Sequence, residues 1–187
     1  SKNPVLVAEA DEFDRSFLQL FPEIAVITSM DADQLDIYGD ELHVKEAFKA
    51  FASQVSGTVI IKHGLDITPA DTSARIRTYS FGNPEADFHA EPLEDGHFNL
   101  HYPGGVIEDC VVGIPGWVNV ENATAASAIA LTYGIAPEKI KRALASFSGV
   151  RRRFDIQVRK PGCIYIDDYA HHPEEIKAAL SSIRRAY

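Results

Sequence analysis

The alternation of apolar runs and amphipathic segments in the first sixty residues is the strongest constraint on the fold. PVLVAEA (4–10), IAVIT (24–28) and TVII (58–61) are short apolar runs of the kind found in strands that are buried on both faces of a parallel sheet. The segments between them, 11–21 and 43–55, place apolar side chains at helical spacing. Strands that alternate with helices predict an α/β fold built on a parallel sheet with flanking helices.

The middle of the chain has a different pattern. Residues 76–116 contain four short runs separated by turn residues, which predicts an antiparallel β section. Pro137 has the position of a first helical residue, because proline lacks the N–H that is unpaired there in any case. The elements expected after the β section are helices over 118–133 and 137–147, strands over 154–158 and 163–167, and a helix from His172.

Charge and composition exclude several classes of function. The net charge of −9 and the pI of about 5.2 argue against a general binder of nucleic acid or anionic membranes. No apolar stretch reaches the roughly 18–20 residues that a membrane-spanning helix needs. Cys110 and Cys163 stand apart in apolar runs, which is typical of buried thiols in a reducing cytoplasm. We therefore expect a cytoplasmic protein in which 151–153 (RRR) is the one basic cluster.

Acidic residues follow two of the expected strands, in EADEFD (9–14) and MDADQLD (30–36). The carboxyl ends of parallel strands are where α/β proteins bind ligands, and neighbouring carboxylates there favour Mg²⁺, which prefers oxygen ligands. Acidic residues also stabilise the first turn of a helix, so a solvated helix start and an exposed polar loop are the alternative interpretations.

Two later groups of polar residues have the chemistry of nucleotide contacts. Asn119 and Asn122 are three positions apart, on one face of an expected helix, and a carboxamide can donate to and accept from a purine edge. The alternative is that Asn119 is an N-cap and Asn122 a surface residue. Arginine forks bind phosphate bidentately, so RRRFD (151–155) is a candidate phosphate clamp, although basic trios are usually solvated surface.

DDYAHHPEEI (167–176) concentrates acids and histidines at the end of an expected strand. Strand alternation directs Asp167 and Asp168 to opposite faces, which argues against one shared ion. His172 precedes a proline and so has the position of an N-cap, with Glu175 at the third helical position of a capping box. A substrate-contact loop is therefore favoured over a zinc site, and a zinc hydrolase built on these residues is the weaker alternative.

In this order, the segments resemble the motifs of the Mur ligase family. The similar stretches are EADEFDRSFL, MDADQLD, NVENATAA, GVRRRFD and DDYAHHPEE. The resemblance runs over nearly the whole chain, and it is most specific where RRFD and DDYAHHP occur together. It implies that residues 1–153 are the later part of a central ATP-binding domain and 154–187 the beginning of a C-terminal, Rossmann-like ligase domain. The family's GxxxxGK[ST] phosphate loop is absent, so we expect a fragment that is inactive by itself.

The resemblance also implies a reaction and its participants. ATP would phosphorylate the muramoyl carboxylate of UDP-N-acetylmuramate, and the amine of L-alanine would attack the acyl phosphate. Glu9 and Gln34 would hold Mg²⁺, Asn119 and Asn122 would contact adenine, and Arg152 or Arg153 would contact the γ-phosphate. Asp168, Tyr169 and His171 would lie near the nucleotide and the incoming amino acid.

Two positions depart from the family pattern. Gln34 stands where the family has a histidine, which weakens the case for a second metal ion, and Val118 stands where the family has a second histidine.

Two alternative functions stay open, a ligase that attaches a preformed tripeptide in wall recycling and a non-catalytic nucleotide-binding module. Helix 173–186 carries Ile176, Leu180 and Ile183 on one side. It is expected to pack on the central domain, to pair with a second copy as a homodimer, or to be mobile.

Overall fold

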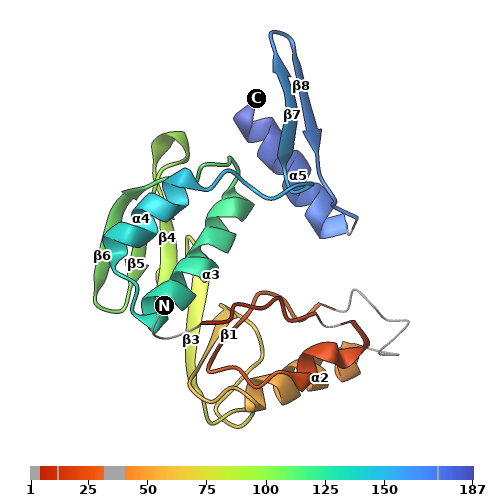
Figure 1. The fold of residues 1–187 in the computed structure, drawn as a ribbon, viewed down its shortest axis with the longest axis vertical. Helices are drawn as coiled ribbons and strands as arrows, with labels where there is room; N and C mark the ends of the chain where they lie inside the picture. The colour runs from red at the N-terminus through yellow and green to blue at the C-terminus, as the bar shows by residue number, and fades with distance from the viewer. Residues whose placement is uncertain (1–4, 12, 32–40, 172) are drawn as a thin grey trace. The chain divides into compact units, whose positions relative to one another are not determined.

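The computed structural model describes residues 5–11, 13–31, 41–171 and 173–187 (Figure 1). The chain divides into two compact units, Ser1–Ile76 and Arg77–Tyr187. The domain boundary expected at 153/154 from the family resemblance stays a prediction. No helix in the described ranges combines the length and the apolar character that crossing a membrane requires.

The first unit contains the expected alternation of strand and helix. Its elements are η1 (Phe13–Gln19), β1 (Ile24–Ile27), α2 (Glu41–Ser53) and β2 (Thr58–Lys62). β1 and β2 are parallel, with Ile24 opposite Thr58 and Ile27 opposite Ile61. The predicted pair of buried parallel strands and the predicted helix between them are therefore confirmed. The helix expected over 11–21 is a shorter 3₁₀ helix.

Aromatic packing joins η1 to α2. The Phe17 ring lies 5.3 Å from that of Phe48 and 5.1 Å from that of Phe51, in tilted geometries that aromatic pairs favour. The side chain of Gln54 donates hydrogen bonds to the carbonyl oxygens of Leu18 and Leu20, at 3.1 and 2.6 Å. These bonds satisfy backbone acceptors at the end of η1, and they fix this turn beside the core of the first unit.

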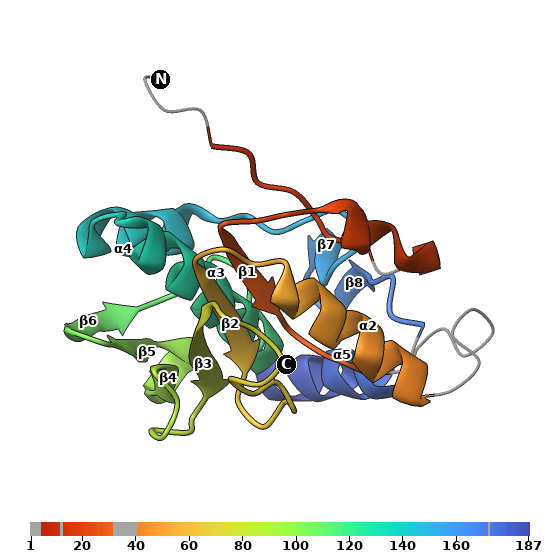
Figure 2. The same cartoon turned by 90° about the horizontal axis from the view of Figure 1, so that it is seen from below.

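The strand predicted for PVLVAEA (4–10) is wrong in the part that the structure describes. Residues 5–11 belong to no strand and are drawn as a coil in Figure 2. Val5, Leu6 and Val7 are 55%, 89% and 88% exposed. An apolar run becomes a buried strand only when neighbouring strands supply hydrogen-bond partners and cover its faces. In the described residues no strand pairs with this segment.

The β section comprises β3 (Arg75–Phe81), β4 (Phe88–Pro92), β5 (Phe98–Tyr102) and β6 (Gly105–Cys110), with a short 3₁₀ turn, η2 (Glu94–Gly96). The strands from β3 to β6 are hydrogen-bonded in sequence order. β4, β5 and β6 are antiparallel as expected, whereas β3 and β4 are parallel. Because β3 and β4 are parallel, the connection between them is not a hairpin. In this connection, the Asp87 carboxylate accepts a hydrogen bond from the Thr78 N–H at 2.8 Å.

Two helices pack against this section (Figure 1). α3 (Trp117–Tyr133) ends at Gly134, which adopts the left-handed conformation, and α4 (Pro137–Ser146) begins at the expected proline. Their apolar residues join one buried cluster with the strands, which comprises Ala90, Phe98, Leu100, Ile107, Cys110, Val112, Val120, Ala123 and Ile140. This core supports the first turns of α3, where the two asparagines lie.

The last elements are β7 (Asp155–Lys160), β8 (Cys163–Asp167) and α5 (Pro173–Ala186), with the two strands forming an antiparallel hairpin. The expectation of a buried thiol is wrong for Cys163, which is exposed at the start of β8, whereas Cys110 is buried. On α5, Ile176 and Leu180 remain 42% and 52% exposed, whereas Ser182 is buried. Ser182 lies against Gly116 at the start of α3, where a Cβ on the glycine would be 2.9 Å from the serine Oγ. α5 therefore contacts the start of α3. The strands and helices described above confirm the predicted α/β fold class.

Candidate active site

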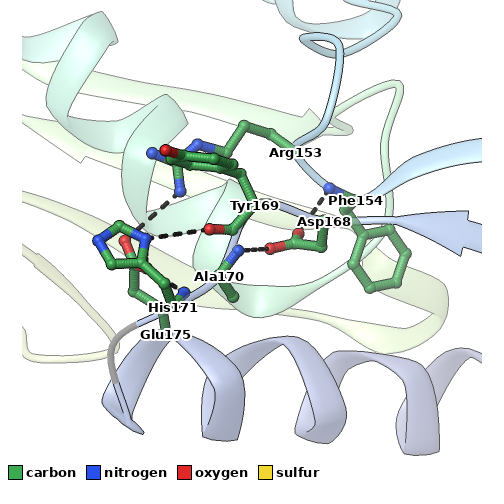
Figure 3. Close-up of polar contacts among 7 residues, drawn as sticks. All are labelled: Arg153, Phe154, Asp168, Tyr169, Ala170, His171 and Glu175. Atoms are coloured by element: carbon green, nitrogen blue, oxygen red, sulfur yellow. Dashed lines mark hydrogen bonds and ion pairs between the residues drawn. The ribbon is translucent and has the colours of Figure 1, made fainter.

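Two segments, the arginine turn (150–155) and the loop 168–171, are joined by one hydrogen bond between their backbones and one from a backbone N–H to the Asp168 carboxylate, the second of which is drawn in Figure 3. The Tyr169 N–H donates to the Arg152 carbonyl at 2.7 Å, and the Phe154 N–H donates to Asp168 Oδ2 at 2.7 Å. The hairpin β7–β8 supplies the geometry, because its two ends start and finish at these segments. Both segments were predicted to carry functional residues, and the structure brings them into contact.

The arginine turn has a strained backbone on both sides of Arg153. Arg152 has φ 61° and Phe154 has φ 50°, and neither is a glycine. Such conformations cost on the order of 1–3 kcal/mol each and persist only where surrounding contacts enforce them. The Arg152 N–H donates to Asp155 Oδ2 at 3.2 Å, and the Phe154 side chain is buried. The turn is therefore held in one defined conformation by its neighbours.

Asp168 acts on the backbone through both of its carboxylate oxygens. Oδ2 accepts the Phe154 N–H, and Oδ1 accepts the Ala170 N–H at 2.8 Å. A carboxylate that accepts two amide protons in a partly buried position organises the chain around it. Asp168 was predicted to be catalytic, and its contacts in the structure are structural ones. Whether it also touches a ligand stays a prediction.

Two guanidinium groups gather at one aromatic ring. The Arg152 guanidinium carbon lies 4.6 Å from the Tyr169 ring centroid, and that of Arg153 lies 6.0 Å from it. The His171 ring meets the same tyrosine edge-on at 5.3 Å. Cation–π contacts hold a guanidinium by its face and leave its N–H edges available to acceptors. Exposed arginine donors and a histidine beside one tyrosine form a surface suited to a phosphate group.

Glu175, in the first turn of α5, contacts both segments, and its sequence position did not reveal this. Its Oε1 lies 3.4 Å from Arg153 Nη1, and its Oε2 accepts the His171 N–H at 3.2 Å (Figure 3). The capping-box interpretation made Glu175 an acceptor for the N–H of His172, which lies outside the described residues, so that interpretation stays a prediction; the contact observed is with the preceding residue, His171. The contact with an arginine 22 positions earlier depends on the fold, so no local pattern could predict it.

The two asparagines lie in the first turns of α3. The N-cap of α3 is Gly116, so the interpretation of Asn119 as an N-cap is wrong. Asn119 is half-buried and its Nδ2 donates to the Pro115 carbonyl at 2.5 Å, whereas Asn122 is exposed. In the described part of the chain, no hydrogen bond or ion pair is recorded between these two residues and the arginine turn. Their contact with adenine stays a prediction.

The predicted metal ligands are not brought together by the described residues. Glu9 is exposed in the segment that forms no strand, and Gln34 lies outside the described residues, as do Asp33 and Asp36. Across residues 5–11, 13–31, 41–171 and 173–187, no three or more His, Cys, Asp or Glu side chains are grouped so that they could hold a metal ion. The Mg²⁺ site stays a prediction, and so does the judgement on a zinc site at the paired histidines, because His172 lies outside the described residues.

A second polar cluster, not singled out from the sequence, lies on β4 and β5. The His89 and His101 rings are stacked, with centroids 4.5 Å apart and planes 5° apart. Glu91 Oε2 lies 2.8 Å from His101 Nε2, and this hydrogen bond, with a second from Asn99, lowers the pKa of Glu91. These residues face one another across an antiparallel pair, so their role is cross-strand stabilisation of the hairpin.

Comparison with known proteins identifies the protein family to which the chain belongs. Residues 5–130 match the family model described as the Mur ligase middle domain. The chain belongs to the Mur ligase family, whose members are ATP-dependent ligases that form amide bonds. This result confirms the resemblance that the ordered motifs indicated.

Individual proteins within the family are similar to this chain in sequence and in structure. The UDP-N-acetylmuramate–L-alanine ligases of Flavobacterium psychrophilum and Porphyromonas gingivalis are 46% and 42% identical to this chain, in alignments of 193 positions that cover 100% of it. The chain spans about two fifths of their length, 41% and 42%. Among solved structures, MurF from Acinetobacter baumannii has a TM-score of 0.78 at 24% identity, over 92% of this chain and 40% of that one. MurC from Thermotoga maritima has a TM-score of 0.72 at 26% identity, over 94% and 41%.

Proposed function

We propose that the chain is part of a ligase that joins L-alanine to UDP-N-acetylmuramate at the expense of ATP, in the synthesis of peptidoglycan precursors. Two lines support this function. The relatives that match the whole chain carry that name, and they are 42–46% identical. The observation that carries the site is the arginine turn pinned to the 168–171 loop, which gathers two guanidinium groups beside Tyr169 and His171.

In the proposed reaction, the carboxylate of the muramoyl group attacks the γ-phosphorus of ATP, and ADP leaves. The amine of L-alanine then attacks the carbonyl carbon of the acyl phosphate, inorganic phosphate leaves, and the amine loses a proton as the amide forms. Negative charge is spread over the phosphoryl oxygens during the first step. Arg152 and Arg153 would stabilise that charge, because fixed donors act most strongly where charge develops.

The remaining predicted residues have roles consistent with this reaction. Asn119 and Asn122 would contact adenine from the start of α3, and Tyr169 and His171 would lie beside the nucleotide and the incoming amino acid. Glu9 and Gln34 would hold Mg²⁺, which commonly takes one or two protein ligands and completes its shell with phosphate oxygens and water. When bound, Mg²⁺ would neutralise part of the phosphate charge.

The chain alone is proposed to be inactive, because it resembles only part of the ligase architecture and lacks the phosphate loop. Its proposed compartment is the cytoplasm, and its proposed ligands are ATP, UDP-N-acetylmuramate and L-alanine, with no nucleic acid or membrane. A homodimer of the isolated chain stays a prediction that sedimentation can test.

The test uses a protein of the relatives' full length that contains this chain. ADP release is measured with UDP-N-acetylmuramate and either L-alanine or the preformed tripeptide, alone and in competition. We expect release that depends on both UDP-N-acetylmuramate and L-alanine, and a preference for L-alanine. A preference for the tripeptide would assign the chain to a wall-recycling ligase instead. Activity that is absent in the wild type and present in Gln34→His would identify a degenerate, non-catalytic module.

A further inference from the structure

We infer that Glu175 is a positioning residue that couples the loop 168–171 to Arg153 and so orients the guanidinium that meets the transferred phosphoryl group. This inference rests on the proposed function. The Glu175 carboxylate contacts both segments from α5, with Oε1 3.4 Å from Arg153 Nη1 and Oε2 3.2 Å from the His171 N–H nitrogen. His171 Nδ1 lies 3.6 Å from the same Oε2.

The geometry leaves the arginine able to bind an anion. Glu175 engages Nη1, and a guanidinium has five N–H donors, so most of them remain for a phosphate. The ion pair is partly exposed, with side-chain exposures of 54% for Arg153 and 36% for Glu175. Pairs of this kind are weak, so the contact orients the guanidinium without locking it.

The negative charge of Glu175 is partly compensated by its surroundings, and this determines whether Glu175 favours or opposes the binding of a phosphate. It lies in the first turn of α5, a helix of 14 residues, where the helix dipole and the His171 N–H both stabilise a carboxylate. Repulsion between Glu175 and a bound phosphate is therefore reduced. When Glu175 is removed, the loss of the orientation of Arg153 outweighs the loss of the repulsion between Glu175 and phosphate. Removal of Glu175 therefore weakens the preference of the protein for a nucleotide that carries a γ-phosphate.

The test measures equilibrium binding to the full-length protein of two Mg²⁺-nucleotides, ADP and the non-hydrolysable analogue adenylyl imidodiphosphate. In E175Q and E175A the affinity ratio of analogue to ADP is expected to fall about two- to fivefold, with ADP affinity unchanged. The matched control is E138Q, which removes a glutamate from the first turn of α4. Thermal melts identify any variant that fails to fold, and E175D then provides a second variant that keeps the charge.

A double-mutant cycle with R153A separates positioning from a structural role. If Glu175 acts through Arg153, E175A adds no further change to the ratio in the R153A background. An equal effect of E175A in both backgrounds, or a ratio like that of E138Q, overturns the inference. An increased ratio overturns it too, because it would make Glu175 a competitor of phosphate. A wild-type protein that binds the nucleotides but does not ligate L-alanine refutes the proposed function separately from this inference.

Discussion

Substitution of Gly116 by alanine tests the contact between α5 and the start of α3. Gly116 has φ 109° and ψ 138°, a conformation that side-chain-bearing residues rarely adopt, which costs on the order of 1–3 kcal/mol. The new Cβ would also lie 2.9 Å from Ser182 Oγ and 3.1 Å from its Cβ. Crowding of this kind typically costs about 1–3 kcal/mol. α5 can relieve part of the crowding by moving, because Ile176 and Leu180 are largely exposed and hold it weakly. We therefore expect a total destabilisation of about 2–4 kcal/mol.

The matched control is Gly134→Ala at the other end of the same helix. Gly134 also has a positive φ, 97°, but a Cβ added there would meet no atom within 4 Å. Its substitution should cost only the backbone term, about 1–2 kcal/mol. Urea unfolding is followed by the fluorescence of Trp117, the single tryptophan, which is adjacent to Gly116. Hydrogen exchange in α5 should accelerate in G116A and remain unchanged in G134A.

The double variant G116A/S182G removes the crowding and keeps the backbone cost. We expect it to recover at least about 1 kcal/mol relative to the sum of the two single variants, because the two sites are in contact. If G116A is no less stable than G134A, or if the two substitutions are additive, α5 does not pack on the start of α3 as described.

Three further predictions concern the described side chains. D168N should destabilise the chain by about 1 kcal/mol, because one of the two backbone N–H groups that Asp168 accepts loses its acceptor; an unchanged urea midpoint would contradict this. A thiol reagent should label exposed Cys163 at once and Cys110 only after unfolding, because burial raises the pKa of the Cys110 thiol; two fast thiols would contradict it. The pKa of Glu91 is lowered mainly by its hydrogen bond with His101, so the stability that this carboxylate contributes is present above its unfolded-state pKa and is lost as pH falls through its folded-state pKa. The difference in melting temperature between wild type and E91Q should therefore shrink as pH falls below about 4, and a difference that grows would contradict the assignment.

Local patterns were sufficient to predict most elements of this fold. β1 and β2 are short apolar runs, and their residues have a high intrinsic preference for buried strands. α4 begins at Pro137 because proline is tolerated in the first turn of a helix and not in its interior. The run 4–10 shows the limit of this reasoning. Its composition matches that of β2, but a strand also needs partners, and those are not specified by the run itself.

The residues of the candidate site could be named from the sequence, and their roles stay predictions, whereas the geometry that joins them was not predicted. The resemblance to the Mur ligase family implied that Arg153 and His171 belong to one site, and in the structure both side chains lie beside the Tyr169 ring. The positive φ angles that flank Arg153 and the bridge made by Glu175 arise from contacts between segments far apart in the chain. A sequence pattern reports preferences of neighbouring residues, so it cannot specify a conformation that distant contacts impose.

The most direct test of the central claim compares two nearby arginines in the full-length protein. Arg151 and Arg153 are both exposed, and in the described residues Arg153 alone of the two is recorded in contact with Tyr169 and Glu175. L-alanine-dependent release of ADP is measured for R151A and R153A in the presence of UDP-N-acetylmuramate. If the arginine turn serves the phosphoryl group, R153A should lose on the order of 100-fold or more in kcat/KM, and R151A should stay within about threefold of wild type. Equal activities of the two variants would contradict the assignment of this turn to the active site.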